Sequence, residues 1–465
     1  MTSGFRRDAR RAAALMATLT AFALAGCATA SLSNPVNQPL TIAAPHPQPP
    51  GLNIDGDVVA LSFSGGGARA AAFSFGVLEG LREMPRAGGG SLLDHVALVS
   101  AVSGGAITAA YFGQRGVEGL SGFRAAYLDK DWASELHTSF ASPLNWARAY
   151  DGALNERDRL ADWLNAEIYQ DGTIADLWRL NRPRIWINAT DLYSGVPFAF
   201  DPIYFDALCS DLAHVRIADA VAASMSVPLV FRPVVLASYA DQCKTPLPEW
   251  VAKSARDKQT SELMRTTARA FESYRDPTRV RYLHLVDGGV ADNFGLSSLI
   301  MMRRAATTPF APFTPRDAVR VRRMTFLVVN AEQGPAGDWA LTQKGPGGAE
   351  TLTAAMDGAI NVSKRKSYDT FRDTIARWER DVRQYRCALP RAEAARLAAG
   401  IKNWDCHNVH FTVDMISFAD LPADQSKTLG AVETRVSLPT ETIDALIAGG
   451  KQAVKANAAA RALER

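Results

Sequence analysis

The sequence predicts an α/β protein of three layers, with helices on both sides of a mostly parallel central sheet and a helical C-terminal extension. Short apolar runs alternate with segments whose apolar residues recur at helical spacing, and this alternation is typical of such sheets. Two of the runs end in glycine-rich turns that lead directly into a helical pattern. The composition, 47% hydrophobic and 21% charged residues, suits a folded globular chain of this length.

The expected elements can be placed along the chain. Five runs have the length and composition of buried strands: Val58–Phe63, His95–Val102, Ile185–Ala189, Tyr282–Val286 and Phe326–Asn330. Helical spacing lies between them at Ala70–Glu83, Gly105–Phe112 and Ile217–Ser224. No internal repeat interrupts this order, so we expect one core, residues 56–335, with residues 336–465 packed on it.

Two regions depart from this order. The charged segment 241–279 places a set of side chains on one helical face: Leu263, Thr267, Ala270, Phe271 and Tyr274. This segment is either a cap over a lipid-sized pocket or a peripheral helix packed on the core. Long helical patterns at Ala349–Gln384 and Thr440–Ala460 form the C-terminal extension.

The N-terminus has the features of a targeting segment. Residues 1–26 hold a basic start and an apolar core of 15 residues, which is short for a membrane span of about 20. The core ends in Leu24-Ala25-Gly26-Cys27, which resembles a bacterial lipoprotein signal. That resemblance implies lipidation of Cys27; the alternative is a secretory peptide cut at Ala28–Ala30.

We therefore expect an exported protein, held by its lipid anchor in the bacterial cell envelope, at the outer membrane, with residues 27–55 as a flexible tether. The formal net charge is +3, and the four arginines and one aspartate before Cys27 account for it. The rest of the chain is near neutral, which argues against a nucleic-acid partner.

Four cysteines remain after Cys27. An even number in an exported chain favours two disulfides, and pairing of neighbours closes the shortest loops: Cys209–Cys243 and Cys387–Cys406. Four buried thiols are the alternative. His407 and His410 follow Cys406, but positions three apart on a strand face opposite sides, so we expect no metal.

The first turn with chemical potential is Gly65-Gly66-Gly67, which brings backbone N–H groups close to a negative charge. No Lys-Ser/Thr pair follows, so it is not a Walker A loop. With Ala70 it fits the dinucleotide pattern G-x-G-x-x-A, yet the acidic residue that should bind the ribose, Asp94, precedes the next strand instead of ending it. A merely structural turn remains an alternative.

The second turn carries Ser103. Ala101-Val102-Ser103-Gly104-Gly105 approximates G-x-S-x-G, in which a serine on a sharp strand-to-helix turn projects its hydroxyl from the sheet. A serine that simply caps the helix is the alternative. Because adjacent parallel strands end at the same sheet edge, this turn and the glycine loop should lie together.

A serine needs a base. Of the seven histidines none follows a strand as the histidine of an α/β hydrolase does, and His284 lies inside an apolar run, where a core histidine is expected. Asp287 stands at a strand end, followed by Gly288 and Gly289. An Asp-Gly hairpin turn is the alternative reading of that stretch.

Together these residues resemble the patatin-like phospholipase family. The glycine loop with Arg69 resembles its oxyanion loop, Ser103 its nucleophile turn, and Asp287-Gly288-Gly289 its catalytic aspartate motif. Two accessory stretches also match, namely Asn188–Leu192, and Ala223-Ser224 with Pro228, Phe231 and Pro233. Ala70 and Ala101 depart from the family, which has glycine at both places. The resemblance covers about residues 58–330.

The resemblance implies a Ser103–Asp287 dyad without histidine or cofactor, acting on phospholipids or other acyl lipids. Burial should raise the pKa of Asp287. The backbone N–H groups of the loop would hold the oxyanion; the residues concerned are Gly65, Gly66, Gly67 and Ala68. Arg69 would support this loop or reach a substrate phosphate. The alternatives are a Ser-His-Asp esterase using His284, an inactive lipid-binding lipoprotein and, more remotely, a nucleotide-binding protein.

Overall fold

The computed structural model describes most of the chain: residues 34–40, 54, 56–86, 89–135, 153–155, 157–180, 182–244, 246–334 and 338–464. The expected signal segment 1–26, the lipidation site Cys27 and most of the tether 27–55 lie outside the described residues. Among the residues that are described, no helix has the length and apolar character needed to cross a membrane.

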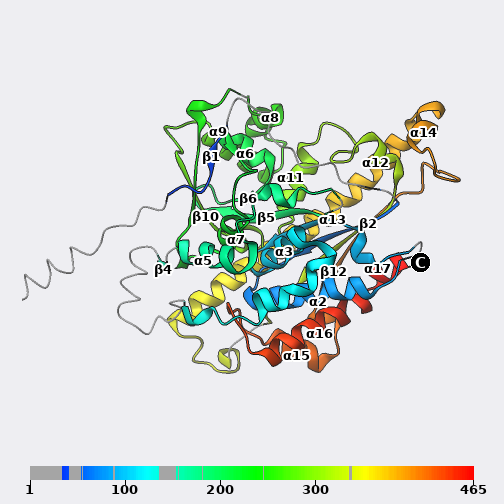
Figure 1. Ribbon diagram of the computed structural model, residues 1–465. Helices are drawn as coiled ribbons and strands as arrows, with labels where there is room; N and C mark the ends of the chain where they lie inside the picture. Colours follow the sequence, from blue (N-terminus) through cyan, green and yellow to red (C-terminus); the bar gives the residue numbers. More distant parts are fainter. Residues whose placement is uncertain are drawn as a thin grey trace, which may run out of the picture. The chain divides into compact units, whose positions relative to one another are not determined.

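The centre of the fold is an eight-stranded sheet (Figure 1). Its strands are β2 (Gly56–Phe63), β3 (Val96–Val102), β5 (Arg184–Asp191), β6 (Val196–Ala199), β9 (Val234–Ala237), β10 (Tyr282–Asp287), β11 (Val321–Asn330) and β12 (His410–Ser417). The order is β12-β11-β2-β3-β5-β10-β9, and β6 also pairs with β5. The first five strands of this order are mutually parallel, whereas β10 runs antiparallel to both of its neighbours. The predicted mostly parallel sheet is confirmed.

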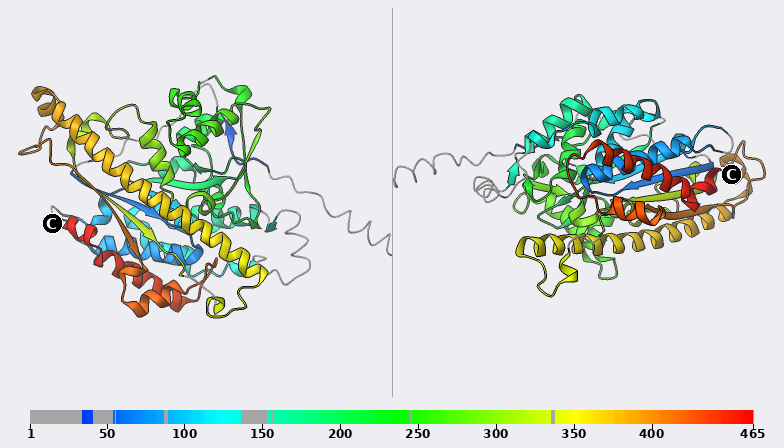
Figure 2. Two further views of the ribbon diagram at one scale, coloured as in Figure 1. Left: turned by 180° about the vertical axis from the view of Figure 1, so that it is seen from behind. Right: turned by 90° about the horizontal axis from the view of Figure 1, so that it is seen from below.

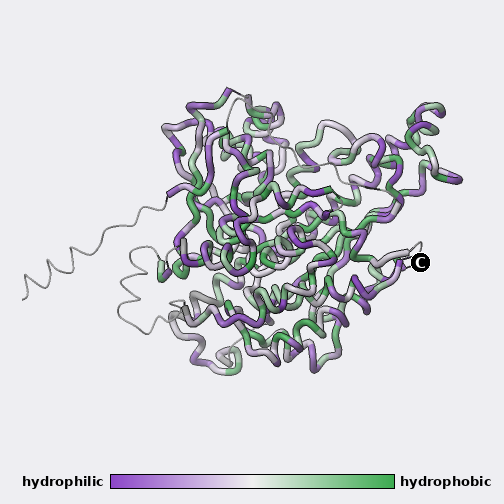
Figure 3. Tube along the Cα trace, viewed as in Figure 1, coloured by the Kyte–Doolittle hydropathy of each residue, from purple (hydrophilic) through white to green (hydrophobic). Residues whose placement is uncertain are grey.

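Helices cover both faces of the sheet, as the alternation of side chains along β2 illustrates. Val59, Leu61 and Phe63 belong to one buried cluster, and Val58 and Ala60 to another on the opposite face. The first cluster is completed by α2 (Gly67–Glu83), α3 (Gly104–Gly119) and α16 (Thr440–Ala456), the second by α11 (Ser297–Ala305) and α13 (Gly348–Ala388). The two opposite layers are visible in Figure 2 (right), and Figure 3 shows how hydrophobic and hydrophilic stretches alternate along the chain.

The C-terminal extension is more than helical decoration, because it also supplies β12 to the sheet. This strand pairs in parallel with β11 over eight residues, which the sequence patterns did not indicate. Within the extension, α16 packs closely on α2. A Cβ at Gly76 would lie 2.2 Å from the carbonyl oxygen of Ile447, and one at Gly450 2.3 Å from that of Phe73. Glycine at both places allows the two helices to approach.

The segment 241–279 forms α8 (Glu249–Arg256) and α9 (Glu262–Tyr274). The Phe271 ring packs against Tyr204 and Trp250, and the Tyr274 hydroxyl donates to Asp191 Oδ2 at 2.9 Å. A cavity of about 20 Å³, room for one water, lies beside Phe271, and neither Ser103 nor Asp287 lines it. The predicted apolar face of α9 is therefore buried on the core.

Candidate active site

Ser103 occupies a strained turn between β3 and α3. Its backbone has φ 51° and ψ −124°, a conformation that costs a non-glycine residue free energy and that the serine of a strand-turn-helix motif adopts. Its backbone N–H donates to Ser224 Oγ at 2.7 Å. The side chain is almost buried, with 7% of the residue exposed.

The small residues after Ser103 allow its turn to meet the glycine loop. A Cβ at Gly104 would lie 2.0 Å from the carbonyl oxygen of Gly67, and one at Gly105 2.6 Å from that of Ser64. A Cβ at Gly65 would in turn be 3.2 Å from Ser103 Cβ. The two turns thus lie in contact, as the parallel arrangement of β2 and β3 predicts.

Asp287 reaches Ser103 by a route that the sequence did not reveal. β3 pairs with residues 184–188 of β5, and β10 pairs with residues 189–191. Because β6 pairs with residues 188–191 at the other edge, β3 and β10 share one edge of β5 and lie end to end. Val102 is opposite Asn188, and Asp287 is opposite Ala189. Because β3 and β10 run in opposite directions along this edge, their carboxyl ends meet.

Glycine is required where these two strands meet. A Cβ at Gly288 would lie 2.4 Å from the carbonyl oxygen of Asn188 and 3.0 Å from Val102 Cγ1. The second glycine of the motif, Gly289, donates its N–H to Asp287 Oδ1 at 2.7 Å. The first glycine admits the aspartate to the junction, and the second orients its carboxyl group.

The Ser103 side chain and the Asp287 carboxyl group lie at the junction of β3 and β10, close enough for the serine to lower the pKa of the aspartate through hydrogen bonding. Burial raises the pKa of Asp287 from 3.8 to about 6, against the opposing effect of the hydrogen bonds from Gly289 and Ser103. An aspartate with this pKa is a far better proton acceptor near neutral pH than an exposed one.

The two accessory stretches supply side chains that form hydrogen bonds around Ser103 and Asp287. Ser224 Oγ donates to the carbonyl oxygen of Asn188 at 2.6 Å while it accepts from Ser103. The Asn188 amide donates to Ser100 Oγ at 2.9 Å, and Thr190 Oγ1 donates to the Asp287 carbonyl oxygen at 2.9 Å. These polar side chains link β3, β5 and β10. The family resemblance identified the two stretches but gave no role for them.

The four expected oxyanion donors fall into two groups. The N–H of Gly65 donates to Asn293, and that of Ala68 donates to the carbonyl oxygen of Arg435 at 2.8 Å. Within the described residues, the N–H groups of Gly66 and Gly67 have no acceptor. Both glycines have positive φ, 141° and 58°, a backbone conformation that glycine adopts readily.

Arg69 is buried and holds the glycine loop to two other segments. Its Nε donates to the carbonyl oxygen of Ala331 at 2.9 Å, at the end of β11, and its Nη1 donates to that of Val432 in the extension. Burial lowers the pKa of this guanidinium to about 10, which Asp357 and Glu332 partly oppose. Of the two roles expected for Arg69, these contacts correspond to loop support.

His284 does not have the environment expected of it. The prediction of a core histidine is wrong, because the His284 side chain is exposed. Tyr282, two residues earlier on the same face of β10, is exposed as well. Along a strand, residues three apart face opposite sides, so His284 points away from the side that carries Asp287.

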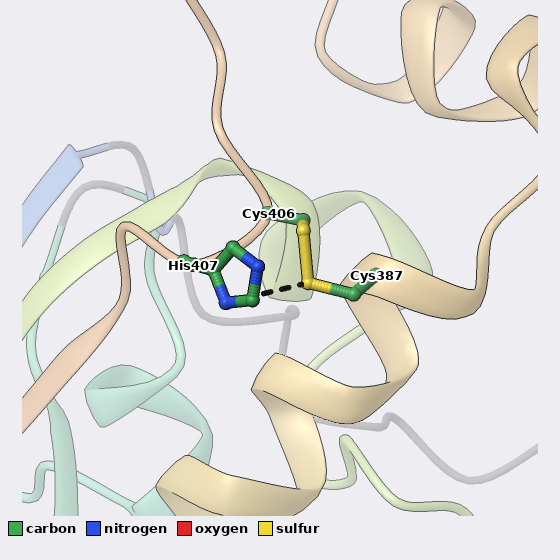
Figure 4. A group of neighbouring side chains, drawn as sticks. All are labelled: Cys387, Cys406 and His407. Carbon is green, nitrogen blue, oxygen red and sulfur yellow. Dashed lines mark hydrogen bonds between the residues drawn. A yellow bond between two sulfur atoms is a disulfide. The ribbon is translucent and has the colours of Figure 1, made fainter.

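Both expected disulfides are present, Cys209–Cys243 and Cys387–Cys406. The second lies at the end of α13, and His407 Nδ1 is 3.9 Å from Cys387 Sγ (Figure 4). These three side chains could provide metal ligands by position, but sulfurs joined in a disulfide are not thiolates. His410 stands apart, exposed at the start of β12.

The fold and this arrangement define a class: α/β proteins in which a serine on a strand-to-helix turn lies against a glycine-rich loop. Within that class the chain belongs to the patatin-like phospholipase family, whose family model matches residues 61–300, just over half of the chain. No curated protein matches the chain.

Two solved structures match parts of this chain at low identity. Human GIVD cytosolic phospholipase A2 has 14% identity and a TM-score of 0.30, covering 65% of this chain and 48% of its own. VipD from Legionella pneumophila has 13% identity and a TM-score of 0.32, covering 93% of this chain and 72% of its own. The chain thus spans about half the length of the human protein.

Proposed function

We propose that this protein is a serine acyl hydrolase that cleaves carboxylic ester bonds of phospholipids or other acyl lipids through Ser103 and Asp287. Membership of the patatin-like phospholipase family supports the lipid substrate. The observation that carries the assignment of residues is that Ser103 and the buried Asp287 lie where the carboxyl ends of β3 and β10 meet, with Ser103 against the glycine loop. Burial there raises the pKa of Asp287 to about 6. No metal or organic cofactor is required by this chemistry.

In the first half of the reaction, Asp287 accepts the hydroxyl proton of Ser103 as Oγ forms a bond to the ester carbonyl carbon. The carbonyl oxygen becomes an oxyanion, to which the N–H groups of Gly66 and Gly67 donate; one such donor contributes about 3–4 kcal/mol of barrier lowering. The C–O bond to the alcohol then breaks, and the alcohol leaves with the proton from Asp287. The acyl group remains on Ser103.

In the second half, water replaces the alcohol. Asp287 accepts a proton from the water as its oxygen attacks the acyl carbon, and the same two N–H groups hold the second oxyanion. The bond to Ser103 Oγ breaks, Oγ takes the proton back, and the carboxylic acid leaves.

The test is covalent labelling by a fluorophosphonate probe together with ester turnover. We expect labelling of the folded protein and its loss in Ser103→Ala. Asp287→Asn should abolish turnover, whereas His284→Ala should leave it within about twofold. Loss of turnover in His284→Ala would favour the Ser-His-Asp esterase, and folded protein that is neither labelled nor active would favour a lipid-binding lipoprotein.

We also propose that the protein is exported and anchored through a lipid on Cys27, on the basis of the Leu24-Ala25-Gly26-Cys27 sequence. Cells grown with labelled palmitate should incorporate the label into the protein and not into Cys27→Ser. Incorporation into both would contradict the anchor.

A further inference from the structure

The large hydrophobic side chains that are exposed in the described residues are unevenly distributed. Ten of them are more than a third exposed. Nine lie in segments at the carboxyl-terminal edge of the parallel strands, and we call these nine the apolar rim: Leu192, Tyr193, Val227, Leu229, Tyr282, Val290, Leu341, Met356 and Val362. The tenth, Leu180, precedes β5 and therefore lies at the opposite edge. Single exposed apolar residues are ordinary, but nine at one edge indicate an interaction surface.

The apolar rim is continuous with the surroundings of Asp287. Val290 follows Gly289, which donates to the Asp287 carboxyl group. Val227 follows Ser226, whose carbonyl oxygen accepts from the Asp287 N–H at 2.9 Å. The rim therefore borders the place where an ester must enter.

The start of α13 extends this rim. Ser363 Oγ donates to the carbonyl oxygen of Ala291, which fixes this part of α13 beside α10 (Gly289–Asp292). Val362 is the preceding residue, and Met356, seven residues before Ser363, lies two turns away on the same face as Ser363. Figure 2 (left) shows this end of α13 projecting past the strands.

Charge on α13 fits a membrane surface. Arg365 and Lys366 are exposed three and four residues after Val362, so they lie on its face about 5.4 Å farther along the helix. Apolar side chains with cations one turn behind them match the depth profile of an interface with anionic head groups. Asp357 is one acid of this region, and it interacts with the buried Lys364 and Arg69.

We propose that the apolar rim docks the protein on anionic phospholipid bilayers, so that ester lipids pass from the bilayer to Ser103. The choice of a lipid as partner rests on the proposed function. The docking surface is separate from the anchor expected at Cys27, since it is formed by the folded domain.

The experiment measures co-sedimentation with vesicles of phosphatidylcholine and phosphatidylglycerol. It uses the full chain with Cys27→Ser, which excludes lipidation, and Ser103→Ala, which prevents hydrolysis of the vesicles. We expect the triple variant Leu341→Ser, Met356→Ser, Val362→Ser to bind the vesicles at least roughly tenfold more weakly than the unsubstituted protein. Leu180→Ser, the matched control at the opposite edge, should bind within about twofold of the unsubstituted protein.

A second measurement does not require removal of the rim. With the other four cysteines in disulfides, an environment-sensitive fluorophore can be attached to Met356→Cys or to Leu180→Cys. Vesicles should shift the emission to the blue at position 356 and not at position 180. Equal shifts, or equal vesicle binding by the triple variant and the unsubstituted protein, would overturn the proposal.

The two proposals can fail separately. With Ser103 retained, turnover of a short-chain, water-soluble ester reports the hydrolase and should stay within about twofold in the triple variant. An unsubstituted protein that binds vesicles through the rim but turns over no ester would contradict the hydrolase alone.

Discussion

The segment 61–300 and the C-terminal extension contribute to the candidate site in different ways. The first segment supplies the side chains of the proposed dyad, Ser103 and Asp287, on two turns with recognisable sequences. The extension supplies backbone carbonyl groups: that of Arg435 accepts from Ala68, and that of Val432 accepts from Arg69. The difference teaches that side-chain chemistry can be assigned from motifs, whereas the backbone support that shapes a site leaves no motif behind.

The most damaging change should be Asp287→Asn, which removes the base. We expect ester turnover to fall by roughly 10³-fold or more. The folded-state pKa of Asp287, about 6, exceeds its ordinary 3.8, so ionisation of the native protein opposes folding above pH 6. In urea unfolding at pH 8, the free energy of unfolding of the asparagine variant should therefore exceed that of the unsubstituted protein by about 3 kcal/mol. This gain in stability should vanish below pH 4.

Both measurements bear on the role of the segment 61–300. A variant that is inactive and no more stable at pH 8 would contradict the raised pKa. A variant that keeps its turnover would contradict Asp287 as the base.

Gly67→Ala tests the contact between the two regions. Gly67 has φ 58°, and its added Cβ would lie 2.3 Å from the carbonyl oxygen of Arg435, so the loop or the extension must move. We expect kcat to fall about 100-fold through loss of one oxyanion donor. Gly358→Ala, with nothing within 4 Å of its Cβ on exposed α13, is the control and should leave kcat unchanged. If both variants retain full kcat, the extension does not shape the loop.

Arg69→Met tests which of two roles this arginine has. If Arg69 supports the loop, its loss should raise the free energy of the transition state by about 2 kcal/mol. The value of kcat/KM should then fall roughly 30-fold for phospholipids and neutral esters alike. As a phosphate contact, it would raise KM for phospholipids and leave neutral esters unaffected. Parallel kinetics with the two substrates distinguish these outcomes, and only the second would contradict the observed contacts.

The pH profile should show the smallest effect. Because Asp287 must be ionised to accept a proton, kcat/KM should be near its plateau at pH 7 and about tenfold lower at pH 5, following the pKa of about 6. The decline belongs to Asp287 if it is absent from the residual activity of Asp287→Asn. A plateau that extends to pH 4 would mean that burial does not raise this pKa in solution.

Sequence and structure agree where residue type determines conformation. A serine between a strand and small residues predicts the Ser103 turn, and three glycines predict the loop beside it. The position of Asp287 was less predictable, because the antiparallel β10 meets β3 end to end along β5, and such a register depends on pairing between distant segments. The engagement of Ala68 by Arg435 was hidden for the same reason. His284 shows that an apolar run does not ensure that both faces of a strand are covered.

The contact of Arg435 with the glycine loop also has a consequence in time. A chain is synthesised from its N-terminus, and segments fold as they become available. Ser103 and Asp287 both precede residue 300, but the carbonyl group that receives the N–H of Ala68 belongs to Arg435, which is made 148 residues after Asp287. The loop therefore acquires this support well after both side chains have been synthesised, and we expect chains that stop before residue 435 to lack a complete oxyanion site.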